Sequence, residues 1–212
     1  MSRSWSAAAV GVAVLPLLLT LACGGGRRDV PTDPDAPAAA LYRVRFDPGD
    51  GEKKRRFRLL VHAADPDRLH GEILSAVGTT ELVLDTGADG VSVLFVRDRI
   101  AYVGGPDERA LDLLLGVPLA PRTMVDVLRG RDPAASQLEW VIVPGDGGYP
   151  REITLNDGPR RLSLELKRLR PIRGDTATFG TGRPPPGVER KSLELLDPDT
   201  VPGIESEGED GT

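Results

Sequence analysis

Short segments in which apolar and polar residues alternate are the feature that most restricts how this chain can fold. The clearest is Leu162 to Leu166, and similar segments lie at 42–46, 56–62, 71–75, 82–84, 91–96, 138–142 and 153–155. A period of two places alternate side chains on one face of a β-strand, so each segment is predicted to be a strand half-buried against a core. Turn sequences rich in Asp, Gly, Asn and Pro lie at 47–51, 65–67, 87–90 and 156–158, which favours an antiparallel meander.

Two short amphipathic helices are predicted among these strands. The first runs from Pro106 to Leu115 and is stopped by Gly116, and the second begins at Pro121 and ends at Gly130. Neither would be stable alone, so each must place its apolar face on the sheet. The predicted fold class is therefore mainly β (α+β), a half-open antiparallel β-barrel with two short helices on the concave side.

The interior of such a barrel can be a packed core or an apolar pocket large enough for lipid, and the sequence leaves both interpretations open. In the second case the predicted lining residues are Leu82, Leu84, Val93, Leu111, Leu114, Leu115, Met124, Leu128, Trp140 and Leu164.

The N-terminal residues resemble a bacterial lipoprotein signal. Arg3 precedes an apolar run from Ala7 to Leu21, which is short for a membrane span and leads to Cys23, the only cysteine of the chain. Residues 1–22 are therefore expected to be a signal peptide, and 23–40 the lipid-bearing cysteine with a flexible linker. An ordinary secretory signal or an N-terminal anchor helix is the alternative, because Thr20 stands where leucine is usual.

The remaining residues divide into one domain at 41–190 and an acidic tail at 191–212, which is predicted to be disordered. A net charge of −5 without a basic, aromatic-containing stripe argues against nucleic acid as a partner. Gly24 follows Cys23, and by resemblance to enterobacterial sorting rules this favours a lipid-anchored position on the periplasmic face of the outer membrane.

The order of segments from Phe57 to Gly130 resembles the outer-membrane lipoprotein receptor family, which is LolB-like and has the unclosed β-barrel of the LolA/LolB type. The resemblance is carried by the segments 78–84, Tyr102, 114–119, 127–130, 150–155 and 162–166, and by Phe179 with 184–187. It implies a monomer that receives lipoproteins from a periplasmic LolA-like carrier, holds their acyl chains and inserts them into the outer membrane. No cofactor and no catalysed reaction are implied.

The family also has a loop that exposes an apolar residue, and the corresponding residues here are Val77 and Gly78. The resemblance implies that this loop touches acyl chains or the membrane, whereas Val77 could equally do no more than cap a hairpin. A structural or lipid-binding lipoprotein of the same fold, without a receptor role, is a further alternative.

An enzymatic alternative comes from Asp85, Thr86 and Gly87, which resemble the active-site motif of retroviral-type aspartic proteases. Asp85 would pair with its twin in a homodimer, Thr86 would support the pair and Gly87 would allow the turn. The same residues also suit a β-hairpin turn. We favour the turn, because Gly116 follows Asp85 by only 31 positions, which is short for the flap and strands of such a protease.

The chain also contains two histidines and a short basic run. His62 and His70 bracket one predicted hairpin and could face each other, but without a cysteine or third histidine nearby no metal site is predicted. The basic run from Lys53 to Arg56 is expected to be a solvated face, or to meet anionic lipid head groups or an acidic carrier.

Overall fold

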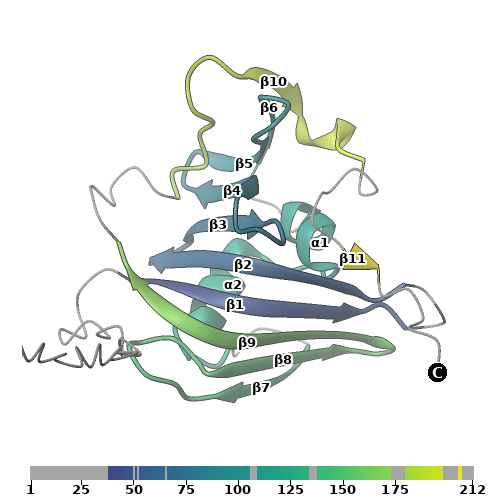
Figure 1. Ribbon diagram of the computed structural model, residues 1–212, viewed down its shortest axis with the longest axis vertical. Coiled ribbons are helices and arrows are strands. Elements are labelled where there is room, and N and C mark those ends of the chain that lie inside the picture. Colours follow the sequence, from purple (N-terminus) through teal and green to yellow (C-terminus); the bar gives the residue numbers. More distant parts are fainter. Residues whose placement is uncertain are drawn as a thin grey trace, which may run out of the picture.

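One large, open β-sheet is the centre of the fold (Figure 1). The computed structural model describes residues 38–49, 51, 53–64, 66–105, 109–133, 138–172, 180–197 and 205–206. The strands are β1 (Ala38–Asp47), β2 (Arg55–Ala64), β3 (Arg68–Leu74), β4 (Thr80–Gly87), β5 (Gly90–Phe95), β6 (Ile100–Gly104), β7 (Glu139–Val143), β8 (Glu152–Asp157), β9 (Arg160–Pro171), β10 (Glu189–Ser192) and β11 (Glu205–Ser206).

Ten of these strands follow the order β10-β6-β5-β4-β3-β2-β1-β9-β8-β7, and β11 pairs with β2 beside this path. Two hairpin series, β1 to β6 and β7 to β9, are joined where β1 pairs with β9, with Val44 opposite Leu164. Every pair is antiparallel except that of β10 and β6, which is parallel and makes the sheet mixed. The end strands β10 and β7 do not pair among the described residues, so the sheet is not closed, and the predicted fold class is confirmed.

Both predicted helices are present, as α1 (Arg109–Leu115) and α2 (Pro121–Leu128), and Figure 1 shows them on the same side of the middle strands. Gly116, at a φ of 77°, separates them, and a Cβ atom there would lie 2.3 Å from the Phe46 ring. Only glycine therefore fits between α1 and β1. Neither helix, nor any other in the described part of the chain, has the length and apolar character needed to span a membrane.

The first strand begins earlier than the sequence predicts. Ala38, Ala39 and Ala40 already belong to β1, so the flexible linker expected to extend to residue 40 ends before them. These alanines are buried regardless of which way they face, and the strand alternates only from Tyr42 onward. The period-two pattern used to place the strand therefore cannot detect them.

The beginning of the expected disordered tail is also ordered, and this part of the prediction is wrong. Strand β10 pairs with β6, and a turn of 3-10 helix at Leu193–Leu195 follows it. Leu193 and Leu196 are each 2 % exposed and belong to the core, where they cover the β6 end of the sheet. The three leucines of this segment, of which Leu195 is exposed, are too few to give a recognisable pattern. Residues 198–204 and 207–212 lie outside the described residues.

Candidate functional site

The apolar interior lies between the two helices and the strands β2, β3 and β4. Its twelve lining residues are all apolar: Phe57, Leu59, Val61, Leu69, Gly71, Ile73, Leu82, Leu84, Leu111, Leu114, Leu115 and Met124. The cavity that remains among them has a volume of about 20 Å³, enough for one water molecule and far too small for an acyl chain. Of the two interpretations that the sequence leaves open, this conformation therefore has the packed interior.

The side chains named from the sequence are distributed unevenly around this interior. Leu82, Leu84, Leu111, Leu114, Leu115 and Met124 line it. Val93, Leu128 and Leu164 are buried in the same core without lining the cavity. Trp140 is partly buried and lies, with Tyr149, in a separate surface groove of about 510 Å³ beside β7. The lining residues of β2 and β3 are not among those predicted, although Phe57, Leu59 and Val61 of β2 are recognisable from their alternation with polar residues.

Gly71 is the one residue without a side chain among the twelve that line the interior. It lies in the middle of β3 on the inward face, opposite Val61 on β2 and Leu84 on β4. A Cβ atom at Gly71 would lie 3.4 Å from Cδ1 of Leu59 and 3.9 Å from Cβ of Leu84, which are ordinary contact distances. A small side chain would therefore fit, whereas a large one would enter the space that the helices cover.

The loop between β3 and β4 presents an apolar residue to solvent. Val77 is 87 % exposed, and Gly78 follows it at a φ of 92°. The loop is closed by backbone hydrogen bonds from Ser75 to Thr79 (2.9 Å) and from Gly78 to Ser75 (3.0 Å). The Arg58 guanidinium also donates to the carbonyl oxygens of Ser75 and Ala76. Val77 is therefore the tip of a loop held in one conformation.

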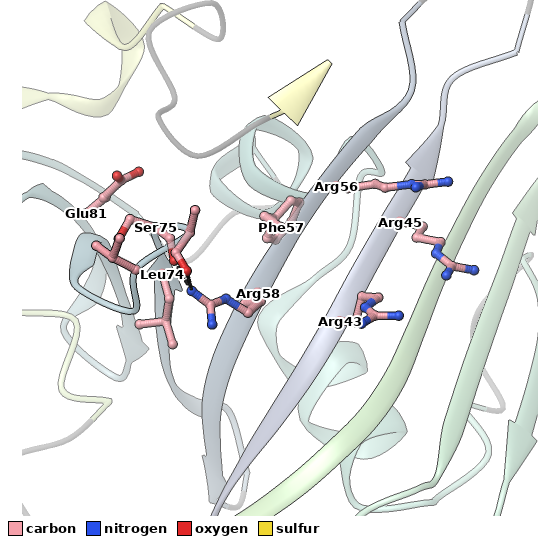
Figure 2. A pocket seen from close by; sticks show the side chains of 10 residues that line it. Arg43, Arg45, Arg56, Phe57, Arg58, Leu74, Ser75 and Glu81 are labelled. Atoms are coloured by element: carbon pink, nitrogen blue, oxygen red, sulfur yellow. Dashed lines mark hydrogen bonds between the residues drawn. The ribbon is translucent and has the colours of Figure 1, made fainter. Parts of the chain in front are cut away.

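Four arginines lie beside this loop, and we call their surface the arginine groove: Arg43, Arg45, Arg56 and Arg58. They line an open groove of about 570 Å³ together with Phe57, Leu74, Glu81 and the loop residues 75–77 (Figure 2). Of the basic run predicted from the sequence, only Arg56 reaches it. Lys54 instead pairs with Asp47 at 2.9 Å, and Arg55 lies over the Phe46 ring.

The Asp85-Thr86-Gly87 motif forms the end of β4 and leads into the predicted hairpin, with Gly87 opposite Gly90. The hydroxyl of Thr86 is buried and donates to the carbonyl oxygen of Asp67 at 2.8 Å. Oδ1 of Asp85 accepts the backbone N–H of Gly180 at 2.9 Å and lies 2.8 Å from Nδ1 of His70. In this arrangement the motif secures the C-terminal segment against β4.

His70 lies between two carboxylates on the outer face of the sheet. Its Nδ1 contacts Asp85, and its Nε2 lies 3.2 Å from Oε1 of Glu72, whose other oxygen accepts the hydroxyl of Thr80 at 2.6 Å. Burial alone would lower the pKa of His70, but the hydrogen bonds to Asp85 and Glu72 outweigh it and raise the pKa to about 9. The bond from His70 in turn lowers the pKa of Glu72. The imidazole of His70 is therefore protonated at neutral pH and offsets part of the negative charge of this cluster.

His62 lies directly opposite His70, as the hairpin predicts, and its Nδ1 is 3.1 Å from the carbonyl oxygen of Ala38. Burial lowers the pKa of His62, so the two histidines differ in charge at neutral pH. No group of three or more potential metal ligands occurs among the residues that the structure describes. Cys23, the predicted lipid attachment site, lies outside those residues.

Comparison with protein-family models and with curated proteins finds no match for this chain. What the structure shows is the fold alone, a mainly-β chain with an unclosed, mixed sheet of ten strands. The family, its lipoprotein cargo and its carrier belong to the proposal that follows.

Proposed function

We propose that this protein is a lipoprotein of the outer membrane, anchored through Cys23, that receives the acyl chains of other lipoproteins and passes them to the membrane. A periplasmic LolA-like carrier would deliver the cargo, and neither a cofactor nor a catalysed reaction is required. The observation that favours this function most is the interior beneath α1 and α2, whose twelve lining residues are all apolar. Loading would be driven by burial of the acyl chain in that interior.

Helix α1 is the part of the interior wall best suited to move. It has seven residues, too few for a helix that is stable alone, and it contributes Leu111, Leu114 and Leu115 to the interior. Exposing three leucines costs about 5–9 kcal/mol, at about 1.5–3 kcal/mol each. An acyl chain that buries about 14 methylenes gains about 11 kcal/mol, at about 0.8 kcal/mol each. The cost of exposing the leucines and the gain from burying the acyl chain are of similar size, which suits a site that must both load and release its ligand.

Val77 would be the contact with the bilayer during release. Its loop is held in one conformation by hydrogen bonds, so an apolar side chain can remain exposed at its tip without collapsing onto the core. A single exposed valine gives only weak affinity for lipid, which fits a transient contact more than permanent insertion.

Binding of an N-palmitoyl peptide that carries a fluorophore tests the proposal. The chain from Gly24 onward is suitable, because every described strand and helix begins at or after Ala38. We expect one palmitoyl chain to be bound per protein, and mass spectrometry of the purified protein should find co-purified lipid. Gly71→Ile should reduce binding about tenfold or more by filling the interior. Ala64→Ile is the matched control, because it adds the same side chain on the outward face of β2.

Absence of palmitoyl binding by the parent chain would contradict the proposal, and so would equal binding by folded Gly71→Ile. Transfer separates a receptor from a lipoprotein that only binds lipid. Cargo offered on a carrier should move to liposomes when this protein is present, whereas binding without transfer would support the alternative without a receptor role.

A further inference from the structure

The arginine groove is a concentration of positive charge on the outward face of β1 and β2. Arg43 and Arg45 on β1 alternate with buried Val44 and Phe46, which places both arginines on the outward face of the sheet. The same alternation on β2 places Arg56 and Arg58 on that face.

The strand register brings these arginines together in like-charge pairs. Arg43 lies directly opposite Arg58, and Arg45 lies directly opposite Arg56. Like charges directly opposite each other destabilise a pair of strands, so this placement needs a compensating anion or a function.

Acidic groups among the described residues compensate the charges of Arg43 and Arg45 only in part. Glu165, opposite Arg43 on β9, lies 3.9 Å from it, but its carboxylate makes a closer contact with Lys167. Glu81 is the one acidic side chain that lines the groove among the described residues. No described carboxylate lies within ion-pairing distance of Arg45. Figure 2 shows the side chains of Arg43, Arg45 and Arg56 extending over β1.

The groove wall also includes apolar residues. Phe57 borders both the arginine groove and the apolar interior, but its side chain is buried on the inward face of β2. Val77, which is 87 % exposed, also belongs to the groove wall. A ligand that suits this surface combines an anionic head, for the guanidinium groups, with an apolar tail.

We propose that the arginine groove binds the phosphate group of an anionic phospholipid, with the start of its acyl chains against the exposed Val77. Guanidinium groups recognise phosphate through paired, charge-assisted hydrogen bonds, and four of them surround a groove of about 570 Å³. The predicted anchor at Cys23 lies 15 residues before Ala38, a tether of at most about 50 Å, so the groove can reach the membrane that holds the protein. This site does not depend on loading of the interior.

Calorimetric titration with soluble short-chain lipids tests the site directly. The probes are dihexanoyl phosphatidylglycerol, dihexanoyl phosphatidylcholine and glycerol 3-phosphate, each added to the chain from Gly24 onward. We expect phosphatidylglycerol to bind at least about tenfold more tightly than phosphatidylcholine, because phosphatidylcholine has no net charge. Glycerol 3-phosphate should bind more weakly than phosphatidylglycerol, because it lacks the acyl chains.

The variant Arg43→Gln/Arg45→Gln should remove the preference for phosphatidylglycerol, and it leaves Arg58 to hold the loop. Arg97→Gln/Arg160→Gln is the matched control, since it removes the same charge from exposed positions that do not line the groove. Binding of palmitoyl peptide should be unchanged in both variants, which separates this site from the proposed function.

Three outcomes would overturn the inference. The first is equal affinity for the two phospholipids, and the second is an equal loss of phosphatidylglycerol affinity in the groove variant and the control variant. The third is that glycerol 3-phosphate binds as tightly as phosphatidylglycerol. The last would make the groove a site for free phosphate esters.

Discussion

The stability of the folded chain should depend on pH through His70, because this imidazole is held between two carboxylates. The side chain of His70 is 14 % exposed, and it contacts Asp85 at 2.8 Å and Glu72 at 3.2 Å. Burial opposes its charged form, but the two hydrogen bonds dominate and raise its pKa from 6.5 to about 9. Replacing His70 by glutamine leaves both carboxylates in place without the positive charge between them.

The pKa of His70 is about 9 in the folded chain and 6.5 in the unfolded chain. A pKa difference of one is worth about 1.4 kcal/mol, so this difference corresponds to about 3 kcal/mol of stability. Because the folded pKa is the higher one, the folded state binds the proton more tightly. The stabilisation is therefore fully present below pH 6.5 and is lost as the pH rises through about 9. Stability should decrease between these values and then level off.

Urea unfolding followed by circular dichroism, at several pH values between 6.5 and 10, measures this contribution. We expect the parent chain to lose about 3 kcal/mol over this range, whereas His70→Gln should be less stable at the acidic end and nearly flat. His62→Gln is the matched control on the facing strand and should keep the slope, because burial lowers the pKa of His62 below this range. An equal slope in His70→Gln, or stability that rises with pH, would refute the reasoning.

The remaining predictions concern separate parts of the molecule. Val77→Glu should impair release of cargo, measured as transfer to liposomes, more than uptake, measured as palmitoyl binding. Equal impairment of release and uptake would contradict the role of the loop. Gly71→Ala should raise the free energy of unfolding by about 0.5–1 kcal/mol in urea, because its methyl group fits and glycine weakens a strand. Tyr149→Phe should lower the free energy of unfolding, measured in urea, by about 1–3 kcal/mol, because the buried hydroxyl accepts the N–H of Ala63 at 3.1 Å. Cys23→Ser should abolish incorporation of labelled palmitate, and retention of the label would disprove the anchor.

Most strands could be predicted from the sequence because one face of each is buried. The segment from Leu162 to Leu166 and the predicted strand at 56–62 both lie within observed strands. The predicted turns at 87–90 and 156–158 connect β4 to β5 and β8 to β9. Prediction failed where burial is not alternating or is slight. The alanines at 38–40 are buried throughout, and Leu193 and Leu196 belong to a segment too short to show a period.

The candidate sites were less predictable than the strands, because each depends on which strands become neighbours. Arg43 and Arg58 are each recognisable as outward-facing, but they form one groove only because β1 and β2 pair in a register that places them opposite each other. Similarly, the role of Asp85 depends on His70 from the adjacent strand and on Gly180, which is 95 residues away along the chain.

The sequence by itself determined the class of fold, since a period of two and tight turns allow little besides an antiparallel sheet, and it also determined the predicted address at Cys23. Only the tertiary structure decided whether the interior is filled. The cavity of about 20 Å³ results from how closely α1 and α2 approach the sheet, and packing distances of this kind are not encoded in the spacing of apolar residues. For the same reason, the arginine groove became visible only when the strand register was known.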